Sequence, residues 1–281
     1  MSPPDFEENR PSWKRRGTGI AVSMSVVGAA LGFAGGGPSN LTAPAQDSSQ
    51  ARPQADDASP RPKTSYAALG VSPAGLVPEV FAPGIVSLKD RYEYGIAISE
   101  DGGEVYFGVA GDVAEIRSLK FKSGQWSPDQ SLIPGATFSF NDPFLSKTGD
   151  RLYFISDAAV TGGGRKRDHD IWFVQREGKG WSDPIHGGTV LNTPFEEYFV
   201  SLTDDGTLYF SSNRTDEGAA GESASFDLYT SALSKGAFAP AQKLPVELNT
   251  KHYEADVFVA PDGSYVIFCA TRPDGLGRGD L

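Results

Sequence analysis

A short phrase that joins a glycine turn to an aromatic run recurs four times between Asp101 and Cys269. The copies are Glu100–Phe107, Lys147–Phe154, Asp204–Phe210 and Pro261–Phe268. Asp-Gly or Gly-Asp supplies the positive φ of a tight turn, and the β-branched and aromatic residues behind it favour a buried strand. The phrase therefore predicts a β-hairpin. Its closing phenylalanines lie 47, 56 and 58 residues apart, which is typical of one stacked or radially arranged unit.

Three further signals recur in step with the hairpin. An acidic residue opens a strand before it, at Glu93, Asp142, Glu197 and Glu254. An aspartate opens a strand after it, at Asp170, Asp227 and Asp280. An aromatic residue followed by proline marks a fourth strand, at Trp126, Trp181 and Phe238, and the next acidic residue follows 16 positions later each time. Four strands in each unit of about 40 to 60 residues predict a β-propeller blade.

The two ends of this pattern predict a ring. Glu79–Ser87 repeats the fourth-strand signal with no blade before it, so we expect it to complete the last blade and protect its edge. Asp280 and Leu281 fall where the third strand of the fourth unit should begin. The expected fold is an all-β propeller of four-stranded antiparallel blades, with three complete blades, a partial fourth and an N-terminal closing strand.

The motifs resemble a known repeat. Asp-Gly-x-x-Leu-Tyr-Phe-x-Ser, a following Asp-Ile-Trp, Gly-x-Gly-Trp-Ser-x-Pro and Leu-Asn-Thr-x-x-x-Glu together resemble the bacterial WD40-like (PD40) repeats of TolB-like propellers, over about Val80 to Leu281. The resemblance implies an exported or periplasmic propeller that binds or scaffolds and has no shared catalytic apparatus. It also implies a further blade after Gly277-Arg-Gly-Asp-Leu281, giving five in all.

The N-terminal region differs in composition from the repeats. Lys14-Arg15-Arg16 precedes the uncharged, apolar and small residues Gly17–Ala34, which is the pattern of an export signal. An uncleaved membrane anchor is the alternative, because about eighteen residues is the short end of a bilayer span. We therefore expect a signal or anchor over residues 1–45, a disordered linker over 46–65 and the propeller over 66–281. The protein would then be exported, either to the periplasm or to the outer face of the inner membrane.

The charge balance limits the partners. A net charge of −11 argues against nucleic acid and favours a basic ligand, a cation or a neutral glycan. The expected partner is thus a protein, a peptide or a glycan. The sequence has no phosphate-binding loop, no nucleophile elbow and no histidine pair at metal-ligand spacing, so no catalytic residue, metal ligand or cofactor is assigned.

The candidate site is a ring of acidic residues at one mouth of the central channel, which the innermost strands should line. Tyrosines beside it could stack on a sugar or pack against a peptide. The candidate ligand-binding residues are Glu93, Asp142, Glu197, Glu254, Asp256, Tyr198 and Tyr253. Crowded carboxylates need protons, arginines or a cation, and Ca²⁺ suits such oxygen ligands. Alternatively, each carboxylate accepts backbone hydrogen bonds and fixes a blade interface.

Two functions remain open from the sequence. The first is a non-enzymatic binding or scaffolding propeller. The second is a glycan-active enzyme whose channel carboxylates act as acid and base. The acidic residues recur equivalently in the blades, which favours binding or scaffolding over catalysis. The regular Asp170, Asp227 and Asp280 are expected to form hydrogen bonds or ion pairs within their blades.

Overall fold

A computed structural model describes residue 69 and residues 77–161, 165–214, 225–273, 275 and 279–281. The predicted signal or anchor and the predicted linker lie outside these residues. Within the part of the chain that the structure describes, no helix has the length and apolar character needed to cross a membrane.

The described residues form antiparallel sheets in chain order, which we number as blades. Blade 1 contains β1 (Glu93–Ile98), β2 (Glu104–Val109), β3 (Glu115–Lys122) and β5 (Gln130–Ser131). Blade 2 contains β6 (Phe140–Leu145), β7 (Arg151–Ala158), β8 (Arg165–Glu177) and β10 (Ile185–His186). Blade 3 contains β11 (Glu197–Leu202), β12 (Leu208–Ser212), β13 (Asp227–Ser231) and β16 (Gln242–Lys243). Blade 4 contains β17 (Tyr253–Val259) and β18 (Val266–Thr271), and a single bridge joins Ala270 to Asp280.

The four predicted hairpins are confirmed, and all share one turn geometry. The turn glycines have positive φ and donate to the carbonyl three residues earlier: Gly102 (68°), Gly149 (69°), Gly206 (85°) and Gly263 (71°). A side chain is strained in this left-handed region, which explains the glycine. The second unit, with Gly-Asp in place of Asp-Gly, makes the same turn as the others.

The aromatic residue before each proline precedes the outer strand instead of belonging to it. Short extensions of the blades hold these aromatics: β4 (Gln125–Trp126), β9 (Gly180–Trp181), and β14 (Leu233–Ser234) paired with β15 (Ala237–Phe238). The outer strand ends five residues after the aromatic in blades 1 to 3. Trp181 packs edge-on against Tyr106 of blade 1, with ring centroids 5.9 Å apart, so this aromatic stabilises a blade interface.

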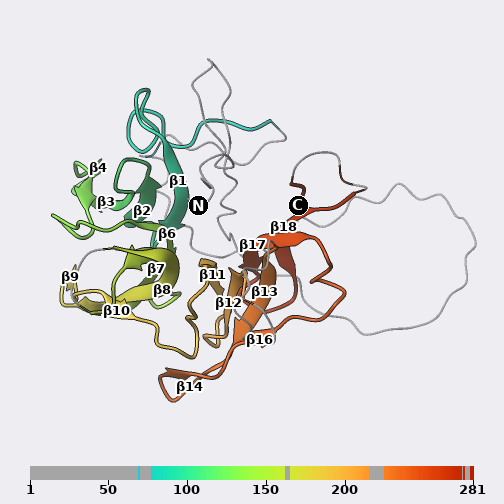
Figure 1. The fold of residues 1–281 in the computed structure, drawn as a ribbon. Coiled ribbons are helices and arrows are strands. Elements are labelled where there is room, and N and C mark those ends of the chain that lie inside the picture. The colour runs from blue at the N-terminus through green and yellow to red at the C-terminus, as the bar shows by residue number, and fades with distance from the viewer. Residues whose placement is uncertain (1–68, 70–76, 162–164, 215–224, 274, 276–278) are drawn as a thin grey trace, which may run out of the picture.

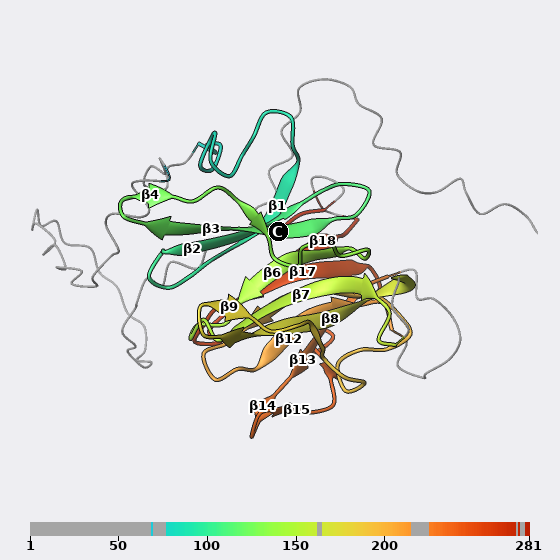
Figure 2. The ribbon, with the colours of Figure 1, turned by 90° about the vertical axis from the view of Figure 1, so that its left-hand side faces the viewer.

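The blades pack face to face around adjoining inner strands. β6 contacts β1 and β11, and β11 contacts β17, so the inner strands follow one another in chain order (Figure 1). Seen from the side, the sheets lie as successive layers (Figure 2). Tyr106 and Ile116 of blade 1 share one apolar core with Leu152 and Phe154 of blade 2. A second core joins blades 2 and 3. Consecutive four-stranded blades packed in this way form a β-propeller fold.

The segment predicted to be a closing strand forms turns instead. Within Glu79–Ser87, the Ala82 carbonyl accepts hydrogen bonds from the amides of residues 85, 86 and 87. Ala82 and Val86 are buried against Val105 and Phe107 of β2. The segment therefore covers the free face of blade 1, and no pairing with β18 occurs among the described residues. The apolar side chains that suggested a strand find burial without joining a sheet.

Asparagine side chains join neighbouring blades. Asn192, between blades 2 and 3, accepts a hydrogen bond from the Ile171 amide (2.7 Å) and donates to the Ile171 carbonyl (3.0 Å). Asn249 makes the same pair of bonds with Leu228 (2.7 and 2.9 Å). Each side-chain amide thus takes the place of a neighbouring strand, because it bonds both the backbone amide and the carbonyl of one residue that would otherwise lack a partner.

Asn192→Ala is expected to lower the free energy of unfolding by about 1–3 kcal/mol, because the Ile171 amide and carbonyl lose their partner in the interior. Asn192 is 5% exposed, so water cannot replace it without local opening. Urea unfolding would measure the loss. Gln242→Ala, at an exposed position of β16, is the control and should change stability by less than about 0.5 kcal/mol. Equal losses of stability for the two variants would contradict a stabilising role of the Asn192 side chain between the blades.

Candidate functional site

Each inner strand contains a β-bulge at the same place. The pairing with the second strand shifts register there, and the residue at the bulge has left-handed backbone conformation. These residues are Gly95 (φ 51°), Asp142 (52°), Phe199 (48°) and Asp256 (58°). Three of the four carry a side chain in a region that favours glycine, and aspartate tolerates it better than phenylalanine does. Bulges of this kind redirect a side chain, and they are common beside functional sites.

The bulges correct one predicted equivalence. Glu93, Glu197 and Glu254 lie two residues before their bulges and pair with Val109, Ser212 and Ala270. The residue that takes this position in blade 2 is Phe140, which pairs with Ser156. Asp142 is instead the counterpart of Asp256. The constant spacing of 16 was misleading because the connection into blade 2 is two residues shorter than those into blades 3 and 4.

The two bulge aspartates lie close enough to interact electrostatically, together with tyrosines from the other inner strands. Asp142 interacts with Asp256, and it adds to the effect of burial in raising the pKa of Tyr94 and of Tyr198. Tyr253 in turn interacts with Asp256. We call Tyr94, Asp142, Tyr198, Tyr253 and Asp256 the central site. It brings together four of the predicted ligand-binding residues, namely Asp142, Asp256, Tyr198 and Tyr253.

The central carboxyl groups have pKa values well above the ordinary value for aspartate. Burial, with a smaller contribution from Asp256, raises the pKa of Asp142 to about 7. Partial burial also raises the pKa of Asp256 to about 6, and the rest of this side chain is exposed. Gly95 allows the close packing on the β1 side, because a Cβ at this position would lie 3.1 Å from Asp142 Oδ1. Among the described residues, the site is therefore an acidic centre in which His169 only partly offsets the effect of burial on Asp142.

A histidine that was not among the predicted site residues borders this site. His169 lies on β8 with its ring 5.2 Å from that of Tyr198, and its Nδ1 is 2.9 Å from Glu196 Oε2 and 3.0 Å from the Tyr198 hydroxyl. His169 also lowers the pKa of Asp142. Its position directly before the recurrent Asp170 was the available signal, since Asp170 lies on the third strand, β8, which pairs with β7, the neighbour of the bulged inner strand β6.

The three glutamates of the predicted ring, Glu93, Glu197 and Glu254, are not part of the central site. They bond to residues in or beside the connections between blades, and we call these groups of contacts joints. Glu197 and Glu254 are 0% exposed. Glu197 accepts hydrogen bonds from Thr193 N (3.0 Å), Thr193 Oγ1 (2.6 Å) and Ser212 Oγ (3.0 Å), and pairs with Arg214 (2.9 Å). Glu254 makes the matching bonds with Thr250 and lies 3.7 Å from Arg272. Glu93 pairs with Arg91 (2.6 Å). Burial raises the pKa of Glu197 to about 7 against the effect of these donors.

The recurrent aspartates of the third strands bond within their own blades, as predicted. Asp170 contacts Lys166 and His186 of blade 2, the latter at 2.8 Å. Asp227 pairs with Lys243 of the outer strand of blade 3 at 2.9 Å. These contacts fix the edge of each blade. Among the residues that the structure describes, no three acidic, histidine or cysteine side chains are grouped closely enough to hold a metal ion.

Comparison with known proteins gives likenesses of fold. No family model matches the chain, and no curated protein matches its sequence. A putative TolB from Agrobacterium tumefaciens is similar to it at 19% identity and a TM-score of 0.40, over 64% of this chain and 59% of that one. A puromycin-hydrolyzing peptidase from Mycobacterium tuberculosis is similar at 16% identity and a TM-score of 0.45, over 67% of this chain and 26% of that one. The chain thus matches less than two thirds of either protein, and the likeness concerns the fold alone.

Proposed function

We propose that this chain is a non-enzymatic binding propeller of the PD40 or TolB-like type, which takes the cationic group of a protein, peptide or amino-sugar ligand at the central site. The repeat motifs support the type. The basic and apolar N-terminal segment supports export, to the periplasm or to the outer face of the inner membrane. The ligand class follows from the central site itself.

The observation that carries the proposal is the placement of Asp142 and Asp256 on equivalent bulges, beside tyrosines. Two carboxyl groups with raised pKa values have a deficit of positive charge around them. An ammonium or guanidinium group would supply that charge, and tyrosine faces attract cations as well. The net charge of −11 draws a cationic ligand toward the molecule.

Binding at this site should release protons. A bound cation favours the ionised carboxylates, so it lowers the pKa of Asp142 from about 7 and that of Asp256 from about 6. At pH 6 the ligand has to displace protons, whereas at pH 8 both groups are already ionised. Affinity should therefore rise between pH 6 and pH 8.

Calorimetry with matched hexapeptides tests the proposal, using a lysine-containing peptide and its glutamate-containing counterpart. Only the lysine peptide should bind, more tightly at pH 8 than at pH 6, and the double variant Asp142→Asn/Asp256→Asn should bind at least about tenfold more weakly. Asparagine tolerates the left-handed backbone at both positions, so the fold should persist, and a thermal melt checks it. Equal binding of the two peptides, or unchanged affinity in the double variant, would refute the proposal.

A glycan-active enzyme is the second candidate, and the pKa of about 7 at Asp142 favours it. A carboxyl group that is partly protonated at neutral pH can act as a general acid, with Asp256 as the second carboxylate. Incubation with a glycan library tests this function. Release of sugar by the parent protein and its absence with Asp142→Asn would establish the enzyme, whereas no release would leave binding as the function.

A further inference from the structure

Three of the four blades place an arginine over the phenylalanine that closes their hairpin. The guanidinium carbon of Arg91 lies 5.3 Å from the ring centre of Phe107, and that of Arg272 lies 5.8 Å from Phe268. In blade 3, Arg214 lies 5.0 Å from Phe210 and 4.8 Å from Tyr229. These arginines also pair with the joint glutamates described above. In these three blades the same aromatic surface therefore receives a planar cation.

Among the side chains that the structure describes, blade 2 has the aromatic surface without an arginine over it. Phe154 is the counterpart of Phe210 and pairs with Trp172 as Phe210 pairs with Tyr229. Ala158 stands where blade 3 has Arg214, because each lies two residues beyond the serine of its strand and donates its amide to that serine's Oγ, at 3.1 and 3.2 Å. Arg165 bonds Asp157 and Ser139, and no contact of its guanidinium with these rings is found among the described residues.

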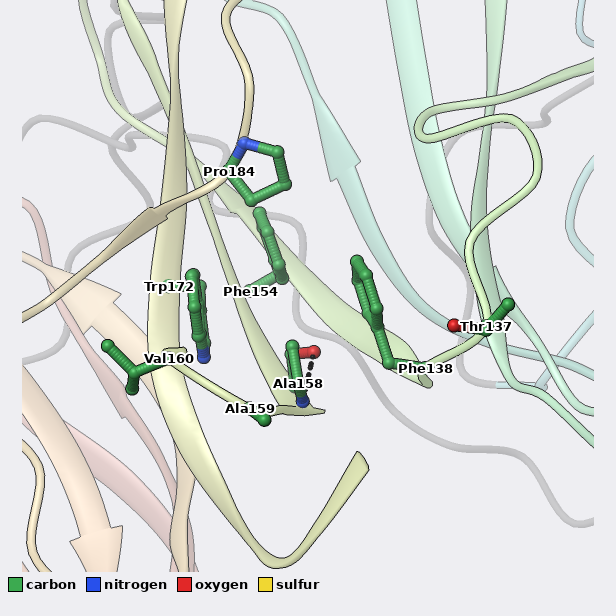
Figure 3. Close-up of a pocket in the computed structure, with 9 residues that line it drawn as sticks. Thr137, Phe138, Phe154, Ala158, Ala159, Val160, Trp172 and Pro184 are labelled. Atoms are coloured by element: carbon green, nitrogen blue, oxygen red, sulfur yellow. Dashed lines mark hydrogen bonds between the residues drawn. The ribbon is translucent and has the colours of Figure 1, made fainter. Parts of the chain in front are cut away.

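A pocket of about 310 Å³ lies where the arginine is missing. Its lining includes Phe154, Ala158, Trp172, Phe138 and Pro184. In Figure 3, Trp172 and Phe138 stand on opposite sides of Phe154 and Ala158, which leaves an aromatic slot between them. A pocket of this volume is at the small end of ligand sites and suits a single side chain.

Polar atoms of the slot and of the strand beside it have unused capacity to accept hydrogen bonds. Asp170 Oδ1 is buried without a hydrogen-bond partner among the described residues, and the Asp170 side chain is 3% exposed. Asp170 lies two residues before Trp172, on the same face of β8. Ser156, which lines the pocket, donates its hydroxyl to the Ser139 carbonyl (2.6 Å) and accepts one bond, from the Ala158 amide, whereas its counterpart Ser212 Oγ also accepts a bond from Arg214 Nε at 3.1 Å. An incoming donor could thus use the remaining acceptor capacity of Ser156 Oγ, as Arg214 uses that of Ser212 Oγ.

We propose that this slot is a second binding site, distinct from the central site, which takes the guanidinium group of an arginine side chain from a partner protein or peptide. The planar group enters between Trp172 and Phe138 and donates to Ser156 Oγ, as Arg214 does within blade 3. The negatively charged protein attracts such a basic partner. Lysine fits less well, since its ammonium is not planar and is more strongly hydrated.

The test uses the full chain and three acetylated, amidated pentapeptides, Gly-Gly-X-Gly-Gly, where X is arginine, citrulline or lysine. The indole N–H resonance of Trp172, assigned with Trp172→Phe, reports occupancy of the slot by NMR. We expect the arginine peptide to shift this resonance and the other two to bind about tenfold more weakly. Free arginine as a fourth ligand shows whether the side chain alone suffices. Equal shifts with citrulline would overturn the proposal.

Ala158→Arg provides the matched variant. Its own guanidinium should occupy the slot, shift the Trp172 resonance in the absence of peptide and abolish the effect of the arginine peptide. A folded Ala158→Arg protein that still binds the arginine peptide at Trp172 would overturn the proposal. The central-site double variant should keep the arginine response. This separates failure of the slot from failure of the proposed function, and the parent protein decides the question if Ala158→Arg does not fold.

Discussion

Glu197→Ala is expected to lower the free energy of unfolding by about 3–5 kcal/mol, the loss that follows when one partner of a buried ion pair is removed. Arg214 would keep its charge in the interior, with its side chain only 13% exposed. The Thr193 amide and the Ser212 hydroxyl would lose their acceptor at the same time. Because this joint ties blade 3 to the connection from blade 2, the loss should reduce the stability of the whole propeller.

Urea unfolding at pH 7 measures this effect, and Asp204→Ala is the control. Asp204 pairs with Lys147 at 2.6 Å, a shorter distance than the Glu197–Arg214 pair, but both side chains are about half exposed. Water and salt screen such a pair, so its loss should cost less than about 1 kcal/mol. If the two variants lost equal stability, burial would not be the source of the effect and the joint would have no special role.

The sequence predicted the hairpins and the blade order because the turns depend on local chemistry. Gly102, Gly149, Gly206 and Gly263 occupy a backbone region that other residues avoid, and the aromatic run behind each has few places to go except a buried strand. The joint glutamates were recognised as recurrent but could not be separated from a ligand ring. Whether a carboxylate lies in a joint or at the centre depends on a shift of two residues along the inner strand and on the bulge that follows.

Asp142 and the N-terminal segment show why local pattern was insufficient elsewhere. Asp142 shares its spacing with Glu197, yet its bulge makes it the counterpart of Asp256, and no spacing reveals a bulge. Glu79–Ser87 has the composition of an outer strand, but Ala82 and Val86 gain as much burial from turns against blade 1. The empty slot of blade 2 was present in the sequence as Ala158, where blade 3 has Arg214, but became meaningful only with the pocket.

Asp142→Asn is expected to stabilise the protein at pH 8 and to leave it unchanged near pH 4. Burial raises the folded-state pKa of Asp142 from its ordinary value of 3.8 to about 7, so the folded protein retains a proton that the unfolded chain releases. Stability from this group is therefore complete below about pH 4 and is lost as the pH rises through 7. About three pKa units correspond to roughly 4 kcal/mol, and partial exposure of the side chain reduces this to about 2–3 kcal/mol.

Comparing variant and parent isolates this group from carboxylates with the opposite dependence. Ion pairs lower the pKa of Glu104 and of Asp129, so those groups add stability as the pH rises, equally in both proteins. The charged and titratable neighbours of Asp142, namely Asp256, His169, Tyr94 and Tyr198, are also unchanged. Urea unfolding from pH 4 to pH 8 should give two curves that separate above pH 5. A variant less stable than the parent at pH 8 would mean that Asp142 is ionised and stabilised in the folded protein. A destabilising carboxyl group at a strained position is, in contrast, what a site pre-formed for a cation requires, because the ligand then supplies the missing charge.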